Sequence, residues 1–167
     1  NGTRADRIKF LLEGFTLLSP SDVTQLVEAI TTESDPGAVI IIDTLAQATP
    51  GGDENAGKDM GLVLNAAKQI SDATHGLVIL VHHSGKNETR GLRGHSSLNG
   101  AMDAVICVER DKMTEIRSWR VTKMKDAEDG ARGRFLLERV ELHPDTFGGL
   151  ITSSAVKEIT GPTAMLA

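Results

Sequence analysis

The run at residues 38–44, Ala-Val-Ile-Ile-Ile-Asp-Thr, constrains the fold of this chain more than any other stretch. Four of its five apolar residues are β-branched, and they follow one another without polar alternation. A half-exposed strand alternates apolar and polar side chains, whereas a strand inside a parallel sheet is apolar on both faces. The turn sequence Asp35-Pro36-Gly37 precedes the run. We therefore predict a central strand, buried on both faces, that ends at Asp43.

A second apolar run at 77–83 ends in His82-His83, and a helical pattern at 58–74 lies between the two runs. A strand–helix–strand order implies parallel pairing with a right-handed crossover. Another helix should begin after Ser19, with Ser19 as its N-cap and Pro20 at the first helical position. The predicted fold class is therefore α/β, with a mostly parallel sheet flanked by helices.

The rest of the chain predicts shorter elements. Before the central strand we expect a short amphipathic helix at 3–13 and a short strand at 15–18. After it come a short helix at 96–102, a third apolar strand at 104–108, a hairpin of strands 114–123 and 134–142, and a last strand at 150–158. Residues 1–160 are thus expected to form one domain with a C-terminal antiparallel extension, followed by a loose tail at 161–167.

Composition limits the function classes. The formal net charge of −5 means that any contact with nucleic acid needs a local basic patch. Four Phe, one Trp and no Tyr argue against base stacking as the main mode of strand binding. The single cysteine, Cys107, has no disulfide partner, which fits a reducing cytoplasm. No apolar stretch reaches the roughly 18 residues of a membrane span, so we expect no membrane partner.

Polar residues follow both predicted parallel strands. Asp43-Thr44 and His82-His83 should meet at the carboxyl edge of the sheet, where α/β proteins bind ligands. There Asp43 can hold Mg²⁺, directly or through water, or it can simply cap the next segment. The two histidines are adjacent on a strand and point to opposite faces, which disfavours a shared zinc ion.

A phosphate-binding P-loop is absent from these 167 residues. No G-x-x-x-x-G-K-[ST] pattern occurs, and Ser84-Gly85-Lys86 lacks both the earlier glycine and the following Ser or Thr. The chain alone is therefore not expected to turn over ATP.

Five motifs in a fixed order nevertheless resemble the RecA-like ATPase core of hexameric replicative helicases, most closely those of the plasmid RepA type and of phages and plasmids. They are the segments at 39–46, 51–55 with Asp59-Met60, 81–86, 91–103 and 121–126, so the resemblance covers more than half of the chain. In that family the P-loop strand, its helix and the strand with the catalytic glutamate come earlier. The resemblance implies that this chain corresponds to the part that begins just after them.

The resemblance assigns roles to individual residues. Asp43 matches the Walker B acid, which with Thr44 would face ATP and Mg²⁺, and His83 matches the γ-phosphate sensor. Residues 44–57 and 84–95 match the two loops of the central channel, where Lys86, Arg90 and Arg93 would contact single-stranded DNA through phosphates. Lys123 and Lys125 match a basic pair that reaches into the neighbouring subunit's ATP, although a Lys in the second position lacks the bidentate fork of Arg.

The predicted function is part of an ATP-driven helicase or translocase that forms a ring and moves on single-stranded DNA. The family resemblance implies that this ring is a hexamer. One alternative within the class is a recombinase-like or KaiC-like ATPase. Another is a non-catalytic DNA-binding or assembly module that kept the fold without a P-loop. A third is a metal-dependent phosphohydrolase built on Asp43, Asp53 and the histidines.

Overall fold

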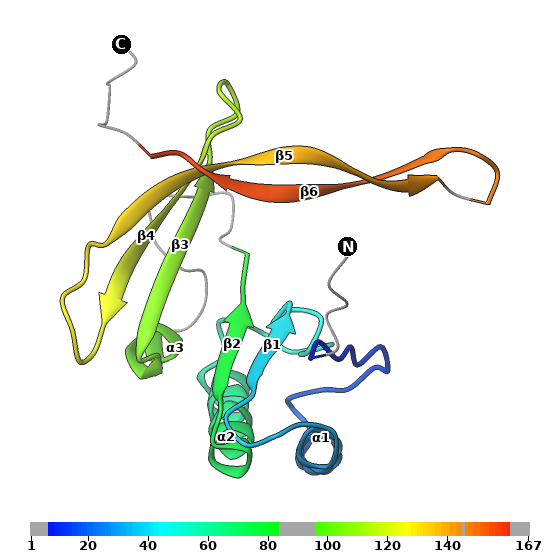
Figure 1. Cartoon of the computed structure of the whole chain (residues 1–167). Coiled ribbons are helices and arrows are strands. Elements are labelled where there is room, and N and C mark those ends of the chain that lie inside the picture. Colours follow the sequence, from blue (N-terminus) through cyan, green and yellow to red (C-terminus); the bar gives the residue numbers. More distant parts are fainter. Residues whose placement is uncertain (1–6, 84–95, 145, 161–167) are drawn as a thin grey trace. The chain divides into compact units, whose positions relative to one another are not determined.

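The computed structural model describes residues 7–83, 96–144 and 146–160, which form two compact units, Asn1–Ala101 and Met102–Ala167. Among these residues no helix is long and apolar enough to cross a membrane. The first unit is α/β and contains a parallel sheet, and the second is an antiparallel sheet, so the predicted fold class is confirmed (Figure 1).

The first unit contains helix α1 (Pro20–Glu33), strand β1 (Val39–Asp43), helix α2 (Gly57–Thr74), strand β2 (Leu77–Val81) and helix α3 (Ser96–Ala101). Strands β1 and β2 pair in parallel, with Val39 opposite Leu77 and Asp43 opposite Val81. The strand–helix–strand prediction is therefore confirmed, and both strands end at the same edge of the sheet.

Glycine 76 allows the two strands to start side by side. The amide of Leu77 donates to the carbonyl of Ala38 at 3.2 Å. A Cβ atom added to Gly76 would lie 2.1 Å from that carbonyl oxygen, so no other residue fits here without a backbone shift.

Only one face of the parallel sheet is buried. Ile42 is 5 % exposed, whereas Val39 and Ile41 are 59 % and 61 % exposed. On β2 the matching positions Leu77 and Ile79 are also exposed. The prediction of a strand buried on both faces is wrong for the described residues, because the sheet has two strands and α1 and α2 lie on one side of it (Figure 1).

The core of this unit joins the two long helices to the strand ends. Its members are fully or almost fully buried apolar side chains: Leu17, Val23, Leu26, Ile42, Leu45, Met60, Val63 and Ile70. Helix α1 begins as predicted, since the Ser19 side chain accepts from the amide of Asp22 and Pro20 opens the first turn. A carboxylate oxygen of Asp22 in turn accepts from the amide of Thr16 at 3.1 Å.

The segment before α1 differs from its prediction. Residues 7–13 form no helix, and residues 15–18 form a turn rather than a strand. The Thr16 hydroxyl accepts from the amide of Leu18 at 3.2 Å, and the amide of Leu17 donates to the carbonyl of Ala48. The backbone of this segment thus forms hydrogen bonds with nearby side chains and one hydrogen bond with a distant residue, and it does not pair with a neighbouring strand.

The second unit is a four-stranded sheet in the order β3 (Ala104–Arg110), β4 (Arg117–Met124), β5 (Arg132–Pro144) and β6 (Leu150–Glu158). All three pairings are antiparallel, which confirms the predicted hairpin and the last strand. Gly133 lies opposite Trp119, and a Cβ atom there would come within 2.9 Å of the indole ring. The apolar run 104–108 thus joins this sheet rather than the parallel one.

Candidate functional site

Asp43 and His83 lie at the carboxyl edge of the parallel sheet, as predicted. Asp43 is the last residue of β1 and lies opposite Val81, the last residue of β2, and His83 follows two residues later. Both are exposed, and neither side chain has a hydrogen bond or ion pair with any residue that the structure describes. A carboxylate and an imidazole are therefore free at one edge of the sheet.

The chain turns sharply after Asp43 but remains joined to β2. The Asp43–Thr44 peptide bond is cis, and the amide of Leu45 donates to the carbonyl of Val81 at 2.8 Å. Leu45 is fully buried. This buried residue and its hydrogen bond fix the backbone two residues beyond the Asp43 carboxylate.

The loop that follows β1 is folded by its own polar groups. The amide of Asp53 donates to the Asp59 carboxylate at 3.0 Å, and the Asp53 carboxylate accepts from the amide of Asn55 at 2.9 Å. Asp59 lies in the first turn of α2, where a carboxylate is favourable. The long loop predicted here is confirmed, and it leads directly into α2.

His82 occupies a different position from its neighbour His83. Its side chain is only 8 % exposed, and its Nε2 atom lies 3.2 Å from a carboxylate oxygen of Glu54. The two ring nitrogens are buried and have no partner in good hydrogen-bond geometry among the described residues. The contact thus links the strand β2 end to the loop after β1. Sequence reasoning missed this pair, because only the folded loop brings Glu54 to the histidine.

The residues at this edge fit a magnesium ion better than zinc. Mg²⁺ binds oxygen ligands and commonly uses one or two carboxylates together with water and substrate phosphates, which matches the free Asp43 carboxylate and the Thr44 hydroxyl beside it. Zinc needs a cluster of Cys, His or carboxylate ligands. In the described part of the chain, no group of three or more His, Cys, Asp or Glu side chains could hold a metal. The phosphohydrolase alternative, which needs Asp43, Asp53 and the histidines together, gains no support.

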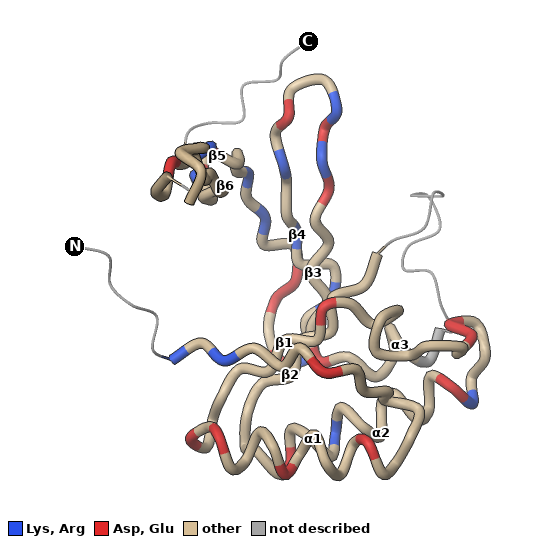
Figure 2. Tube along the Cα trace, turned by 90° about the vertical axis from the view of Figure 1, so that its right-hand side faces the viewer, with Lys and Arg blue, Asp and Glu red and all other residues tan. Residues whose placement is uncertain are grey.

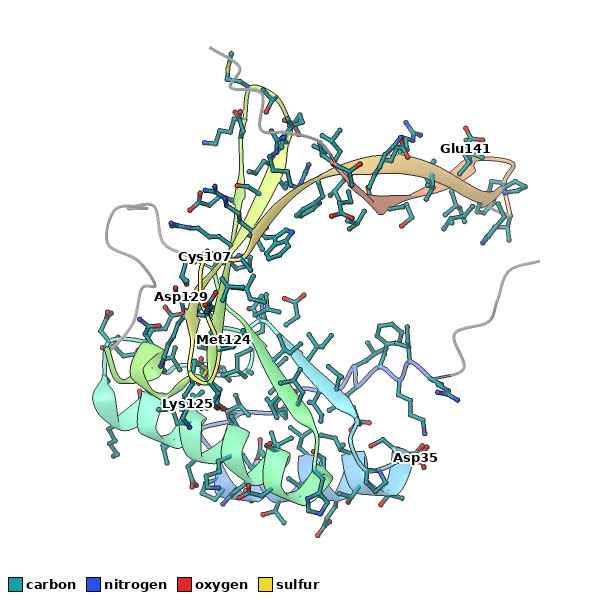
Figure 3. The ribbon with its side chains drawn as sticks, turned by 60° about the vertical axis from the view of Figure 1, so that its left-hand side comes forward. Asp35, Cys107, Met124, Lys125, Asp129 and Glu141 are labelled. Atoms are coloured by element: carbon teal, nitrogen blue, oxygen red, sulfur yellow. The ribbon has the colours of Figure 1, made fainter. Side chains whose placement is uncertain are left out.

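Lys123 and Lys125 belong to the second unit. Lys123 lies within β4 opposite Val105, and Lys125 follows the strand at the turn toward β5 (Figure 3). The Lys125 amide donates to the carbonyl of Asp103 at 2.8 Å, and its Nζ atom lies 3.3 Å from the Asp103 carboxylate. The ion pair is well exposed, so the ammonium group remains available to another anion.

The predicted DNA-contacting residues lie outside the described part of the chain. This concerns Lys86, Arg90 and Arg93, all within 84–95. Their role stays a prediction, as do the roles of Asp43, Thr44, His83, Lys123 and Lys125.

Comparisons with known proteins agree with this architecture. The AAA domain family matches residues 4–89, slightly more than half of the chain, and this region includes the strand ends with Asp43 and His83. No curated protein matches. A crystal structure of the RadB recombinase is similar over 71 % of this chain and 55 % of that chain, with a TM-score of 0.50 and 10 % identity.

The structural likeness at 10 % identity concerns the fold, which is the RecA-like α/β fold. This chain spans about half the length of the recombinase chain that it matches. From the family match, the chain belongs to the AAA domain family, and the structural likeness shows that it has a RecA-like fold.

Proposed function

We propose that this chain is part of an ATP-driven motor that moves along single-stranded DNA as a ring of identical subunits. ATP with Mg²⁺ would bind at the carboxyl edge of β1 and β2, and DNA would contact the loop at 84–95. The plasmid-type helicase motifs in the sequence support this choice over other members of the fold.

One observation carries the proposal: Asp43 ends β1 and His83 follows the end of the neighbouring parallel strand β2, and both are exposed and without a partner in the described structure. Mg²⁺ supplies charge neutralisation when bound with ATP, and the Asp43 carboxylate would hold it. The His83 imidazole can donate a hydrogen bond to a phosphate oxygen. A side chain that senses a phosphate in this way can couple nucleotide state to the loop that follows it.

The ring is the second part of the proposal. Lys125 would approach the ATP of a neighbouring subunit and neutralise charge that develops on its phosphates. Its exposed pairing with Asp103 supports this, because a solvent-exposed ion pair costs little to exchange for a phosphate. A lysine makes a weaker contact than the arginine of related motifs, since it lacks the planar fork.

A recombinase-type ATPase is the second candidate, favoured by the likeness to the RadB recombinase. Both candidates use ATP at the same sheet edge. The two candidates differ in their effect on DNA. A translocase that starts on a single-stranded tail separates the two strands of the adjoining duplex, whereas a recombinase pairs a single strand with a homologous duplex.

Mixed rings test the motor proposal. In the intact protein, Asp43→Asn and Lys125→Ala should each bind nucleotide but hydrolyse it slowly. If each site combines Asp43 of one subunit with Lys125 of its neighbour, rings with both variants regain some fully intact sites and therefore some DNA-stimulated ATP hydrolysis. A verified mixed ring without such rescue would contradict action between subunits. Strand exchange without any unwinding would favour the recombinase candidate.

A further inference from the structure

Three arginines share one face of the second unit. In the β4–β5 register Arg120 lies opposite Arg132, and Arg134 follows two residues along β5. Residues directly opposite in an antiparallel pair, and residues two apart in a strand, project from the same face. Figure 2 shows basic positions repeated along β4 and β5. We name Arg120, Arg132 and Arg134 the arginine face.

Only one of the three arginines has a carboxylate partner among the described residues. Arg120 lies 3.4 Å from a carboxylate oxygen of Glu109, and both side chains are 60 % exposed. The side chains of Arg132 and Arg134 make no hydrogen bond or ion pair within the described part of the chain. Like charges directly opposite each other weaken a sheet. In the chain without a bound anion, the guanidinium groups of the arginine face therefore repel one another, and a bound anion would reduce this repulsion.

A second pair of arginines that lie opposite each other in the same sheet has a carboxylate counter-ion. Arg110 lies opposite Arg117, but Arg110 donates to both carboxylate oxygens of Glu115, at 2.7 and 2.6 Å. Arg117 donates to the Glu115 carbonyl at 2.8 Å. The hydrogen bond from Arg110 lowers the pKa of Glu115, so that this carboxylate stays charged. The pair Arg110–Arg117 thus has a nearby carboxylate as its counter-ion. In the pair Arg120–Arg132, only Arg120 has one among the described residues.

The chemistry of the arginine face suits phosphate groups. Guanidinium groups bind phosphate oxygens through two parallel hydrogen bonds. Arg120 and Arg132 are about 5 Å apart across the strands, and Arg132 and Arg134 are about 7 Å apart along β5. The positions beside them on the same face are Ser118 on β4 and Cys107 and Glu109 on β3, so one carboxylate lies among them. Protein interfaces have large aromatic or aliphatic anchors at their centre, which this group of positions lacks.

We propose that the arginine face binds the sugar–phosphate backbone of a nucleic-acid strand, in addition to the contacts predicted for residues 84–95. Successive phosphates of a strand can each pair with one of these guanidinium groups. Such contacts position a strand without reading its bases. The inference rests on the proposed function in one respect, namely that the strand is single-stranded DNA.

Salt-dependent binding tests this surface. The binding of a fluorescent oligothymidylate to the 167-residue chain is measured by anisotropy over a salt series, with Arg132→Gln, Arg134→Gln and the control Arg117→Gln. Each variant on the arginine face should lower the slope of log affinity against log salt by about 0.7, and the double variant by about 1.4. Arg117→Gln should leave the slope unchanged. Melting temperatures of the Arg132 and Arg134 variants should not fall, since each substitution removes repulsion.

Each other outcome has a defined meaning. Unchanged slopes in both variants, with the parent chain still binding the oligothymidylate, would overturn the surface and leave the motor function standing. Binding of an oligouridylate with the predicted arginine dependence, without binding of the oligothymidylate, would support the surface and contradict a DNA motor. Competition by ATP as strong as by the oligonucleotide, at equal phosphate concentration, would indicate a small-anion site and overturn strand binding. No binding of the parent chain to either strand would also overturn it.

Discussion

The Nε2 atom of the buried His82 lies 3.2 Å from the carboxylate of Glu54, so the end of β2 is tied to the loop that follows β1. His83, the next residue, is exposed and has no described partner. Adjacent side chains on an extended chain point in opposite directions. One histidine of the pair therefore supports the loop, and the other remains free for a ligand.

The His82–Glu54 contact should be measurable as a coupling free energy. His82→Ala and Glu54→Ala should each lower the free energy of unfolding. The loss in the double variant should be about 0.5–1 kcal/mol smaller than the sum of the losses in the two single variants. Urea unfolding of the four proteins measures this value. His83→Ala is the control and should change stability little. Strict additivity of the two substitutions would contradict a stabilising contact.

Two glycines of the first unit should respond oppositely to alanine. Gly76→Ala places a Cβ atom 2.1 Å from the Ala38 carbonyl oxygen, so we expect a loss of roughly 1–3 kcal/mol or more. Gly61 lies within α2 with nothing near its added Cβ, so Gly61→Ala should stabilise by about 0.4–1 kcal/mol. Thermal unfolding compares the two. Equal effects would contradict the close approach at the start of β2.

Acid should weaken the start of α1 through Asp22. The hydrogen bond from Ser19, followed by that from the Thr16 amide, holds the pKa of Asp22 below its ordinary value of 3.8. A carboxylate with a lowered pKa contributes stability above that value and loses it as pH falls through its folded pKa. Asp22→Asn should therefore cost stability near about pH 6 and cost less near about pH 3, as measured by urea midpoints. A pH-independent difference would contradict this contribution.

The sequence pattern predicted most of the regular structure where local signals agreed. Ser19 and Pro20 marked the start of α1, and the uninterrupted apolar runs marked β1 and β2. The hairpin was readable because its strands flank a turn rich in Asp and Gly. These signals are local in the sequence, and the structure contains each of the elements that they predicted.

The failures have physical reasons. Ile8 and Leu12 have helical spacing, yet they are 61 % and 92 % exposed, and a short helix gains most of its stability from burying such a face. At 15–18, hydrogen bonds to Thr16 and Asp22 side chains compete with strand pairing. Whether a second layer covers Val39 and Ile41 depends on other parts of the fold, which an apolar run cannot reveal.

The candidate site was predictable in part for the same reason. Asp43 and His83 end apolar runs, so parallel pairing places them at one edge. Glu54 is separated from His82 by the whole of α2, and only the turns of the loop bring it near. Likewise, the arginine face depends on the β4–β5 register, which places Arg120 opposite Arg132.

ATP hydrolysis by Asp43→Asn in the intact protein tests the proposed catalytic edge most directly, with Asp53→Asn as the matched control on the adjacent loop. An amide holds Mg²⁺ poorly, so Asp43→Asn should fold normally and lose at least about tenfold in turnover, or ~1.4 kcal/mol of barrier. Asp53→Asn should retain most activity, because its carboxylate serves the loop by accepting from Asn55. Turnover of Asp43→Asn within about twofold of the parent, or ~0.4 kcal/mol, would contradict a role for Asp43 as the metal-binding acid.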